Sequence, residues 1–289
     1  MIPWPASPED IKGRILEVLH RRNVGERIFP RKPEDLGPAS SVLVLLGETE
    51  AGNGSDPEPC LVFNKRSRRV RQPGDLCFPG GGLDPRWDEP LARLLALPGL
   101  PLARWPYWKH WKRARPVESR RLALFLAAGL REGLEEMLLN PFGVEFLGHL
   151  PPRSLIMFRR VIYPMVGWAG RQKRFRPNWE VERILRIPLR ELLDPARYAN
   201  YRVRVAPGLR DRVDRPVGDF ACFVHRRGDR AEILWGATFH IVMGFLNLVF
   251  GFEPPGPAGL PVIRGVLEEA YAVGGRRWAV GGRQWGSGR

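Results

Sequence analysis

"GLREGLEEMLLNP", residues 129–141, is the second half of an amphipathic pattern that covers residues 117–140. Leucines recur at every fourth position, which predicts a helix with one apolar face. These leucines are Leu122, Leu126, Leu130, Leu134 and Leu138. Asn140 can cap this helix and Pro141 ends it.

Three glutamates of this segment lie on one side of the predicted helix. Glu132, Glu135 and Glu136 occupy positions i, i+3 and i+4, so their carboxylates project in similar directions beside the apolar stripe. Hard divalent cations prefer such oxygens and also bind substrate phosphates, and Arg131 is placed to pair with a neighbouring acid. The helix alone is consistent with a Mg²⁺ or Mn²⁺ site and equally with a solvated charged face.

A glycine-rich segment precedes the helix. "FPGGG", residues 78–82, predicts a glycine turn where backbone can approach a ligand or an ion without obstruction by side chains. Asp84 and Asp88 follow it. A glycine loop, an acid and a helix with R-E-x-x-E-E together favour a metal-dependent phosphate site over an ordinary helix surface.

This combination resembles the Nudix box, G-x5-E-x7-R-E-U-x-E-E-x-G-U, in which U is a bulky aliphatic residue. Gly82 and Asp88 match its first part, with Asp in place of Glu, and residues 131–136 match its second part. Residues 89–130 separate the two parts, where the family has seven residues. Gly133 stands at an aliphatic position and Leu138 at the position of a glycine.

Residues 65–88, "KRSRRVRQPGDLCFPGGGLDPRWD", are similar to the segment that marks coenzyme A diphosphatases within the Nudix family. The family's histidine before the glycine is missing, because Gln72-Pro73 stands there one residue short. "NWEVERILRIPLRELLDP" (178–195) looks like the family's "NxxEV…PL" strand, and "WGATFHI" (235–241) like its C-terminal "WGxT" helix entry.

The resemblance implies metal-dependent hydrolysis of a nucleoside diphosphate linked to another group, with coenzyme A or acyl-CoA as the expected substrate. It implies Mg²⁺ or Mn²⁺ as the cofactor, held by Glu132, Glu135, Glu136 and Gly81. One of these glutamates, or Glu180, would be the general base, and Arg131 would orient the acids. Substrate contacts are expected from Lys65, Arg66, Arg71, Gly80 and Gly82.

Other functions remain open at this point. The substrate could be another nucleotide diphosphate derivative or a nucleoside triphosphate. Alternatively, the chain could be a non-catalytic Nudix-fold module that binds nucleic acid, although the intact acids disfavour this. An aromatic and basic stretch would serve such a module as a stacking surface, and it would equally serve as a lid or a membrane-surface patch. Its residues are Trp105, Tyr107, Trp108, Lys109, Trp111, Lys112, Arg113 and Arg115.

Composition gives broader limits. The 289 residues carry a net charge of +15, which favours anionic partners, among them a small nucleotide substrate. Three widely spaced cysteines and an N-terminus without a secretory signal pattern predict a cytoplasmic location. The apolar run 233–252 contains His240 and Asn247, which favours a strand followed by a buried helix over a transmembrane segment.

The expected fold class is α/β: a Nudix-type α/β/α sandwich with a mixed sheet and an insertion inside the box. Residues 1–39 would form a helix and linker, 40–252 the Nudix domain, and 253–289 a partly disordered tail rich in Gly, Pro and Arg. The insertion, at about 89–118, would form an excursion outside the sandwich. A helix is expected to about His20, with further helices at 189–195, 238–250 and 261–272. Strands are expected at 40–48, 60–67, 144–150, 159–170, 180–189, 219–227 and 231–237.

Overall fold

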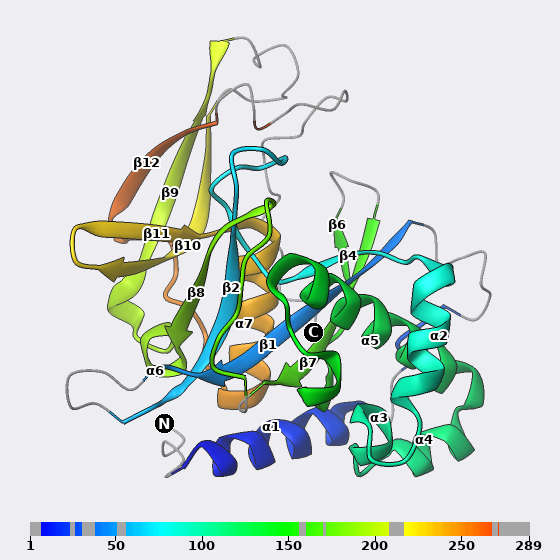
Figure 1. Ribbon diagram of the computed structural model, residues 1–289. Helices are drawn as coiled ribbons and strands as arrows, with labels where there is room; N and C mark the ends of the chain where they lie inside the picture. Colours follow the sequence, from blue (N-terminus) through cyan, green and yellow to red (C-terminus); the bar gives the residue numbers. More distant parts are fainter. Residues whose placement is uncertain are drawn as a thin grey trace.

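A large mixed β-sheet forms the centre of the computed structural model (Figure 1). The structure describes residues 7–23, 27–30, 38–50, 56–155, 160–169, 172–207, 217–267 and 271. The strands of this sheet are β1 (Ala39–Glu48), β2 (Pro59–Arg66), β3 (Leu76–Cys77), β4 (Gly80–Gly82), β5 (Glu145–His149), β6 (Arg153–Leu155), β7 (Arg160–Trp168) and β8 (Val181–Pro188). The main order is β3-β2-β1-β7-β5; β4 pairs with β1, β6 with β7 and β8 with β2. Because β1 is parallel to β7 and antiparallel to β2, the predicted mixed sheet is confirmed.

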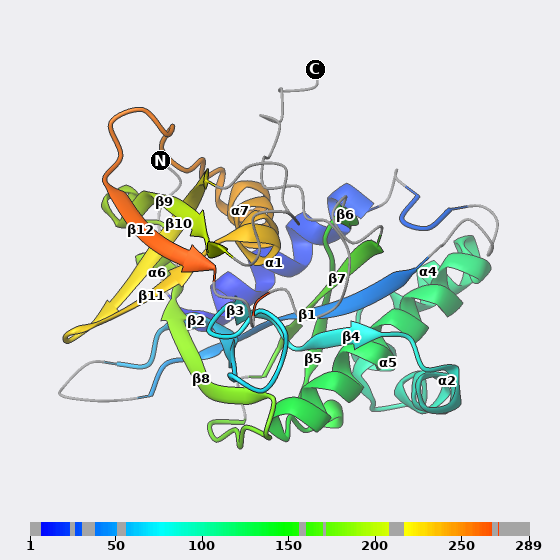
Figure 2. The same ribbon diagram turned by 90° about the horizontal axis from the view of Figure 1, so that it is seen from above.

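Helices cover both faces of this sheet, as Figure 2 shows. On one face, α1 (Pro8–Asn23) and α7 (Gly236–Phe250) share a core with one side of β1 and β2. On the other face, α5 (Pro116–Met137) packs against the opposite side of the same strands. Ser7 caps α1, because its hydroxyl accepts the Asp10 N–H at 3.2 Å. The predicted α/β/α sandwich is therefore confirmed.

The inserted segment forms helices that pack on the α5 side of the sandwich. They are α2 (Pro85–Leu95), α3 (Pro101–Arg104) and α4 (Trp108–Ala114). Trp105, Trp108 and Trp111 are only 3%, 7% and 2% exposed, and they belong to the same core as α5. The interpretation of these residues as a stacking surface, a lid or a membrane patch is wrong, because the rings fill the space between the insertion and the sandwich.

A second, four-stranded sheet lies beside the first; we call it the accessory sheet. Its strands, in the order β11-β10-β9-β12, are β11 (Arg230–Leu234), β10 (Val217–Arg227), β9 (Tyr198–Val205) and β12 (Val262–Leu267). The β10–β11 hairpin matches the predicted one, whereas β9 was not predicted. The helix expected at 261–272 is wrong over residues 262–267, where β12 is a strand parallel to β9 whose side chains alternate in exposure as a sheet requires. Residues 268–270 and 272 of that expectation lie outside the described residues.

The short helix α6 (Leu189–Leu192) joins β8 to the accessory sheet through a 3₁₀ turn, Pro195–Arg197. The apolar run 233–252 forms the end of β11 and α7, as predicted. No helix in the described part of the chain is both long enough and apolar enough to span a bilayer. The expected disorder of the tail concerns mainly residues 268–270 and 272–289, which lie outside the described residues.

The end of α5 differs from the expectation. The helix ends at Met137, and Leu138 follows in a left-handed conformation with φ 51°. Asn140 instead caps a separate 3₁₀ turn, Pro141–Gly143. Leu139 folds back on the helix, where a Cβ on Gly133 would lie 2.8 Å from Leu139 Cδ2. The glycine at an aliphatic position of the box is thus explained by this reversal of the chain.

Candidate active site

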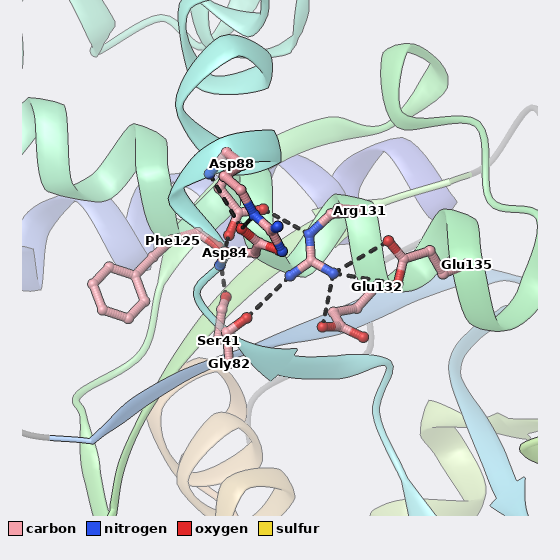
Figure 3. A network of polar contacts seen from close by, with 9 residues as sticks. Ser41, Gly82, Asp84, Asp88, Phe125, Arg131, Glu132 and Glu135 are labelled. Atoms are coloured by element: carbon pink, nitrogen blue, oxygen red, sulfur yellow. Dashed lines mark hydrogen bonds and ion pairs between the residues drawn. The ribbon is translucent and has the colours of Figure 1, made fainter.

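Arg131 lies at the centre of a network that joins α5 to the glycine segment and to α2 (Figure 3). Its Nε donates to Asp88 Oδ1 at 2.7 Å and its Nη2 to the Gly82 carbonyl at 3.0 Å. Its Nη1 lies 3.0 Å from Glu132 Oε1 and 3.2 Å from Glu135 Oε2. Burial alone would lower the pKa of this guanidinium, but the surrounding carboxylates raise it. Arg131 therefore stays charged and fixes the acids around it.

Asp88 links the two halves of the split box. It is completely buried in the first turn of α2, where its Oδ2 accepts the Asp84 N–H at 2.6 Å. Asp84 caps this helix and Pro85 occupies its first turn, so the short loop after β4 directs Asp88 toward Arg131. The insertion leaves this contact intact, because α2 begins before the inserted residues.

Gly81 and Glu132 are in direct contact. Gly81 lies in β4 opposite Ser41 of β1, so the segment expected as a turn is a short strand. A Cβ on Gly81 would lie 2.2 Å from Glu132 Oε1, closer than atoms can approach. Burial raises the pKa of Glu132, while Arg131 lowers it. The predicted proximity of the glycine segment and the acidic helix is confirmed.

Glu136 lies deeper than the other glutamates. Asn64 of β2 donates from Nδ2 to Glu136 Oε2 at 2.7 Å. Burial, helped by Glu132 and Glu180, raises the pKa of Glu136 to about 7, although the Asn64 hydrogen bond and Arg66 lower it. Glu180 lies near Glu136 because Asn178, two residues earlier, donates its backbone N–H to the Glu136 carbonyl at 2.9 Å.

These residues fit a divalent cation. The charge of Glu132 raises the pKa of Glu136, so two partly buried carboxylates lie near one another. Asn64 Oδ1 is buried beside them and finds no hydrogen-bond partner among the described residues. A cation would offset this repulsion and provide a partner for oxygen atoms.

Glu135 points elsewhere: both its oxygens accept from Arg131, and its side chain is 53% exposed. Across the described ranges, no group of three His, Cys, Asp or Glu side chains is gathered closely enough to hold an ion. The predicted ligand set of three glutamates and Gly81 requires Glu135 to leave Arg131, and it stays a prediction.

The expected phosphate contacts divide into two groups. Arg66 lies beside Glu136, and its Nε donates to the Arg71 carbonyl at 2.6 Å. Lys65 does not lie beside Glu132 and Glu136. Successive side chains of a strand point to opposite faces, and its neighbour Asn64 is the one that faces Glu136. The Lys65 Nζ lies 3.4 Å from Glu182 and 3.3 Å from Glu232. A phosphate contact from Lys65 is therefore not supported by its position.

The other predicted glycines have different surroundings. A Cβ on Gly80 would lie 2.4 Å from the Ser41 carbonyl, so close β1–β4 pairing requires glycine there. A Cβ on Gly82 would meet nothing within 4 Å, and only the Gly82 carbonyl takes part in the network.

Sequence reasoning missed two residues that support the site. Asn64 is a buried amide at the end of the apolar run "CLVF", and a polar residue at such a position is a signal that was available. Ser41 donates its hydroxyl to the Phe125 carbonyl at 2.6 Å and so fastens α5 to β1. No pattern in the sequence distinguishes Ser41 from its neighbour Ser40.

Two curated proteins are similar to part of the chain. The chain is 29% identical over 144 residues to an uncharacterised Nudix hydrolase, NudL, of Pectobacterium atrosepticum; the match covers 49% of this chain and 56% of that protein. It is 28% identical over 153 residues to the peroxisomal coenzyme A diphosphatase NUDT7 of Mus musculus, covering 52% of this chain and 49% of that protein. The chain thus spans about half the length of the curated relatives it matches. No family model matches the chain.

Among solved structures, a MutT/nudix family protein from Enterococcus faecalis has a TM-score of 0.38 at 12% identity, covering 86% of this chain and 76% of that chain. A Nudix hydrolase from Alicyclobacillus acidocaldarius has a TM-score of 0.36 at 16% identity, covering 54% and 81%. In its sequence relatives and in its reassembled acidic box, the chain resembles Nudix hydrolases, and among them the coenzyme A diphosphatases.

Proposed function

We propose that the chain hydrolyses the diphosphate bond of a nucleoside diphosphate linked to a second group, with coenzyme A or acyl-CoA as substrate. One observation carries the proposal: Glu132 and Glu136 are partly buried side by side, and Asn64, Arg131 and Gly81 hold them there. Carboxylates buried at such a cost in desolvation are typical of functional sites.

Glu132 and Glu136 would hold Mg²⁺ or Mn²⁺, joined by Glu135 and the Gly81 carbonyl. When bound, the metal would neutralise phosphate charge and lower the pKa of the attacking water. Arg131 keeps Glu132 oriented through their 3.0 Å contact, and Asp88 holds Arg131 from behind. The general base, which takes the proton from water, should be a carboxylate that does not bind the metal. We propose Glu180, beside Glu136, for this role.

The choice of substrate rests on charge and on the relative. Coenzyme A carries a 3′-phosphate besides its diphosphate, and Arg68, Arg69 and Arg71 are exposed on the loop that follows Arg66. The name of the mouse relative records coenzyme A diphosphatase activity for that protein. Another nucleotide diphosphate derivative remains the second candidate, because the family's histidine is missing near Gln72.

A non-catalytic module that binds nucleic acid is the less favoured alternative. Its support came from the aromatic stretch in the insertion, and Trp105, Trp108 and Trp111 are buried. Bases cannot stack on rings that are packed in a core.

The free thiols of Cys60, Cys77 and Cys222 suit the reducing cytoplasm that we propose as the location.

The test is a comparison of coenzyme A, 3′-dephospho-coenzyme A and ADP-ribose at equal Mg²⁺, with products separated by chromatography. We expect coenzyme A to give 4′-phosphopantetheine and 3′,5′-ADP with the highest kcat/KM. A marked preference for ADP-ribose would refute the coenzyme A assignment and leave diphosphate hydrolysis standing. Turnover that is unaffected by EDTA would refute the metal site.

A further inference from the structure

Asp75 is a partly buried carboxylate outside the acidic site, in the loop between β2 and β3. We call residues 67–75 the arginine loop, because Arg68, Arg69 and Arg71 are exposed on it. Trp235 donates from Nε1 to Asp75 Oδ1 at 2.9 Å, and the Tyr271 hydroxyl donates to Asp75 Oδ2 at 2.5 Å. Burial raises the pKa of Asp75 to about 6, although these hydrogen bonds and Arg66 lower it.

Both partners of Asp75 belong to the C-terminal half of the chain. Trp235 follows β11, and Tyr271 lies beyond β12 of the accessory sheet. Their rings pack with Tyr201 and Phe220: the centroids of Tyr201 and Phe220 lie 5.3 Å from that of Trp235, and the centroid of Tyr271 lies 6.1 Å from it. Asp75 is therefore bound to a packed aromatic cluster and not to a solvent-exposed side chain.

Backbone hydrogen bonds connect the arginine loop both to Asp75 and to the residues of the acidic site. The Arg66 N–H bonds the Asp75 carbonyl at 3.0 Å, and the Gly74 N–H bonds the Arg66 carbonyl at 2.9 Å. At the other end of the loop, the Ser67 N–H bonds the Glu180 carbonyl at 2.8 Å. The loop is thus held between the accessory sheet and the residues beside Glu136.

We propose that Asp75 and Tyr271 are positioning residues, through which the accessory sheet holds the arginine loop in place to bind the phosphate groups of the substrate. This inference rests on the proposed function and adds to it. It gives the accessory sheet a role: the sheet determines how tightly the site holds a substrate with a third phosphate. Neither residue touches the reacting atoms, so the effect is on binding and not on the chemical step.

The variants Tyr271→Phe and Asp75→Asn test the attachment, and Tyr198→Phe is the matched control. Tyr198 is in the same sheet, and its hydroxyl donates to the Leu192 carbonyl at 2.7 Å, away from the arginine loop. We expect Tyr271→Phe to raise the KM for coenzyme A about tenfold, as the loss of a hydrogen bond to a charged group should. We expect kcat to change less than about twofold. The KM for 3′-dephospho-coenzyme A should rise less, so discrimination between the two substrates should fall.

Trypsin provides a readout that does not depend on activity. Cleavage after Arg68 or Arg69, located by mass spectrometry, should be faster in Tyr271→Phe than in the wild type or Tyr198→Phe, and coenzyme A should slow it. Unchanged KM and unchanged cleavage in both test variants would overturn the inference, as would an equal rise in KM in the Tyr198→Phe control. If the wild type hydrolyses no diphosphate, the proposed function fails, whereas the cleavage rates still decide whether Tyr271 holds the loop.

Discussion

Alanine substitutions at Gly80, Gly81 and Gly82 can separate effects on stability from effects on activity, because an added Cβ would contact different atoms at each position. At Gly81 an added Cβ would lie 2.2 Å from Oε1 and 2.5 Å from Cδ of Glu132. Ordinary contact needs about 3.5 Å, so the carboxylate would have to retreat by roughly 1 Å. A side-chain carboxylate can move in this way without disrupting β4.

We therefore expect Gly81→Ala to lower kcat/KM about 100-fold, since a misplacement of this size at a catalytic group has that effect. The free energy of unfolding should change by less than about 1 kcal/mol. Gly82→Ala is the matched control for stability: among the described residues its Cβ would meet nothing within 4 Å, so the free energy of unfolding should be kept. Gly80→Ala should instead destabilise the fold, because the Ser41 carbonyl, 2.4 Å from its Cβ, belongs to the backbone of β1.

The assays are steady-state hydrolysis of coenzyme A at saturating Mg²⁺ and urea unfolding of each variant. Full activity in Gly81→Ala would refute the reasoning, because Glu132 could then move without consequence. A loss of stability in Gly82→Ala equal to that in Gly80→Ala would also refute it, since open space around the Gly82 Cβ cannot account for such a loss.

Further expectations follow from the same contacts. Asp88→Ala leaves the Arg131 charge without its buried partner and should lower the free energy of unfolding by about 3 kcal/mol in urea, whereas Arg86→Ala, on the exposed side of α2, should leave it unchanged. Trp111→Ala should cost about 3–5 kcal/mol, and Trp87→Ala, which removes a ring that is 67% exposed, should cost far less; equal Tm values would contradict the buried insertion. The pKa of Glu136 is raised from 4.5 to about 7, so protons compete with a cation below that pH and calorimetric Mg²⁺ affinity should fall as the pH is lowered through about 7. Without metal, the folded state binds this proton more tightly than the unfolded state, so the free energy of unfolding should fall as the pH rises from 4.5 to about 7.

The sequence predicted the sandwich and the acidic helix because both depend on local periodicity. The apolar runs of β1 and β2 and the leucines at every fourth position of α5 depend only on neighbours within one element. The leucine spacing does not predict which side chains are buried near the end of α5, where Leu134 and Leu138 are 42% and 53% exposed. There the chain reverses at Leu138, and the packing of Leu139 on Gly133 decides which face is buried.

The parts that were missed depend on contacts between distant elements. The tryptophans of the insertion have the composition of a binding surface, and only packing against α5 shows that they form core. The strand β12 is short and contains a glycine, and its pairing with β9, a distant element, fixes it as a strand. Lys65 and Asn64 are adjacent in sequence, yet strand alternation places only Asn64 beside Glu136.

Diphosphate hydrolysis should depend on a divalent cation that Glu136 holds. The most direct measurement is a Mg²⁺ titration of coenzyme A hydrolysis by Glu136→Gln, with Glu89→Gln as control, since Glu89 is an exposed acid of α2 that pairs only with Arg93 among the described residues. We expect Glu136→Gln to lose turnover by orders of magnitude at every Mg²⁺ concentration while remaining folded, and Glu89→Gln to match the wild type. Full Mg²⁺-dependent hydrolysis by Glu136→Gln would contradict the assignment of the site.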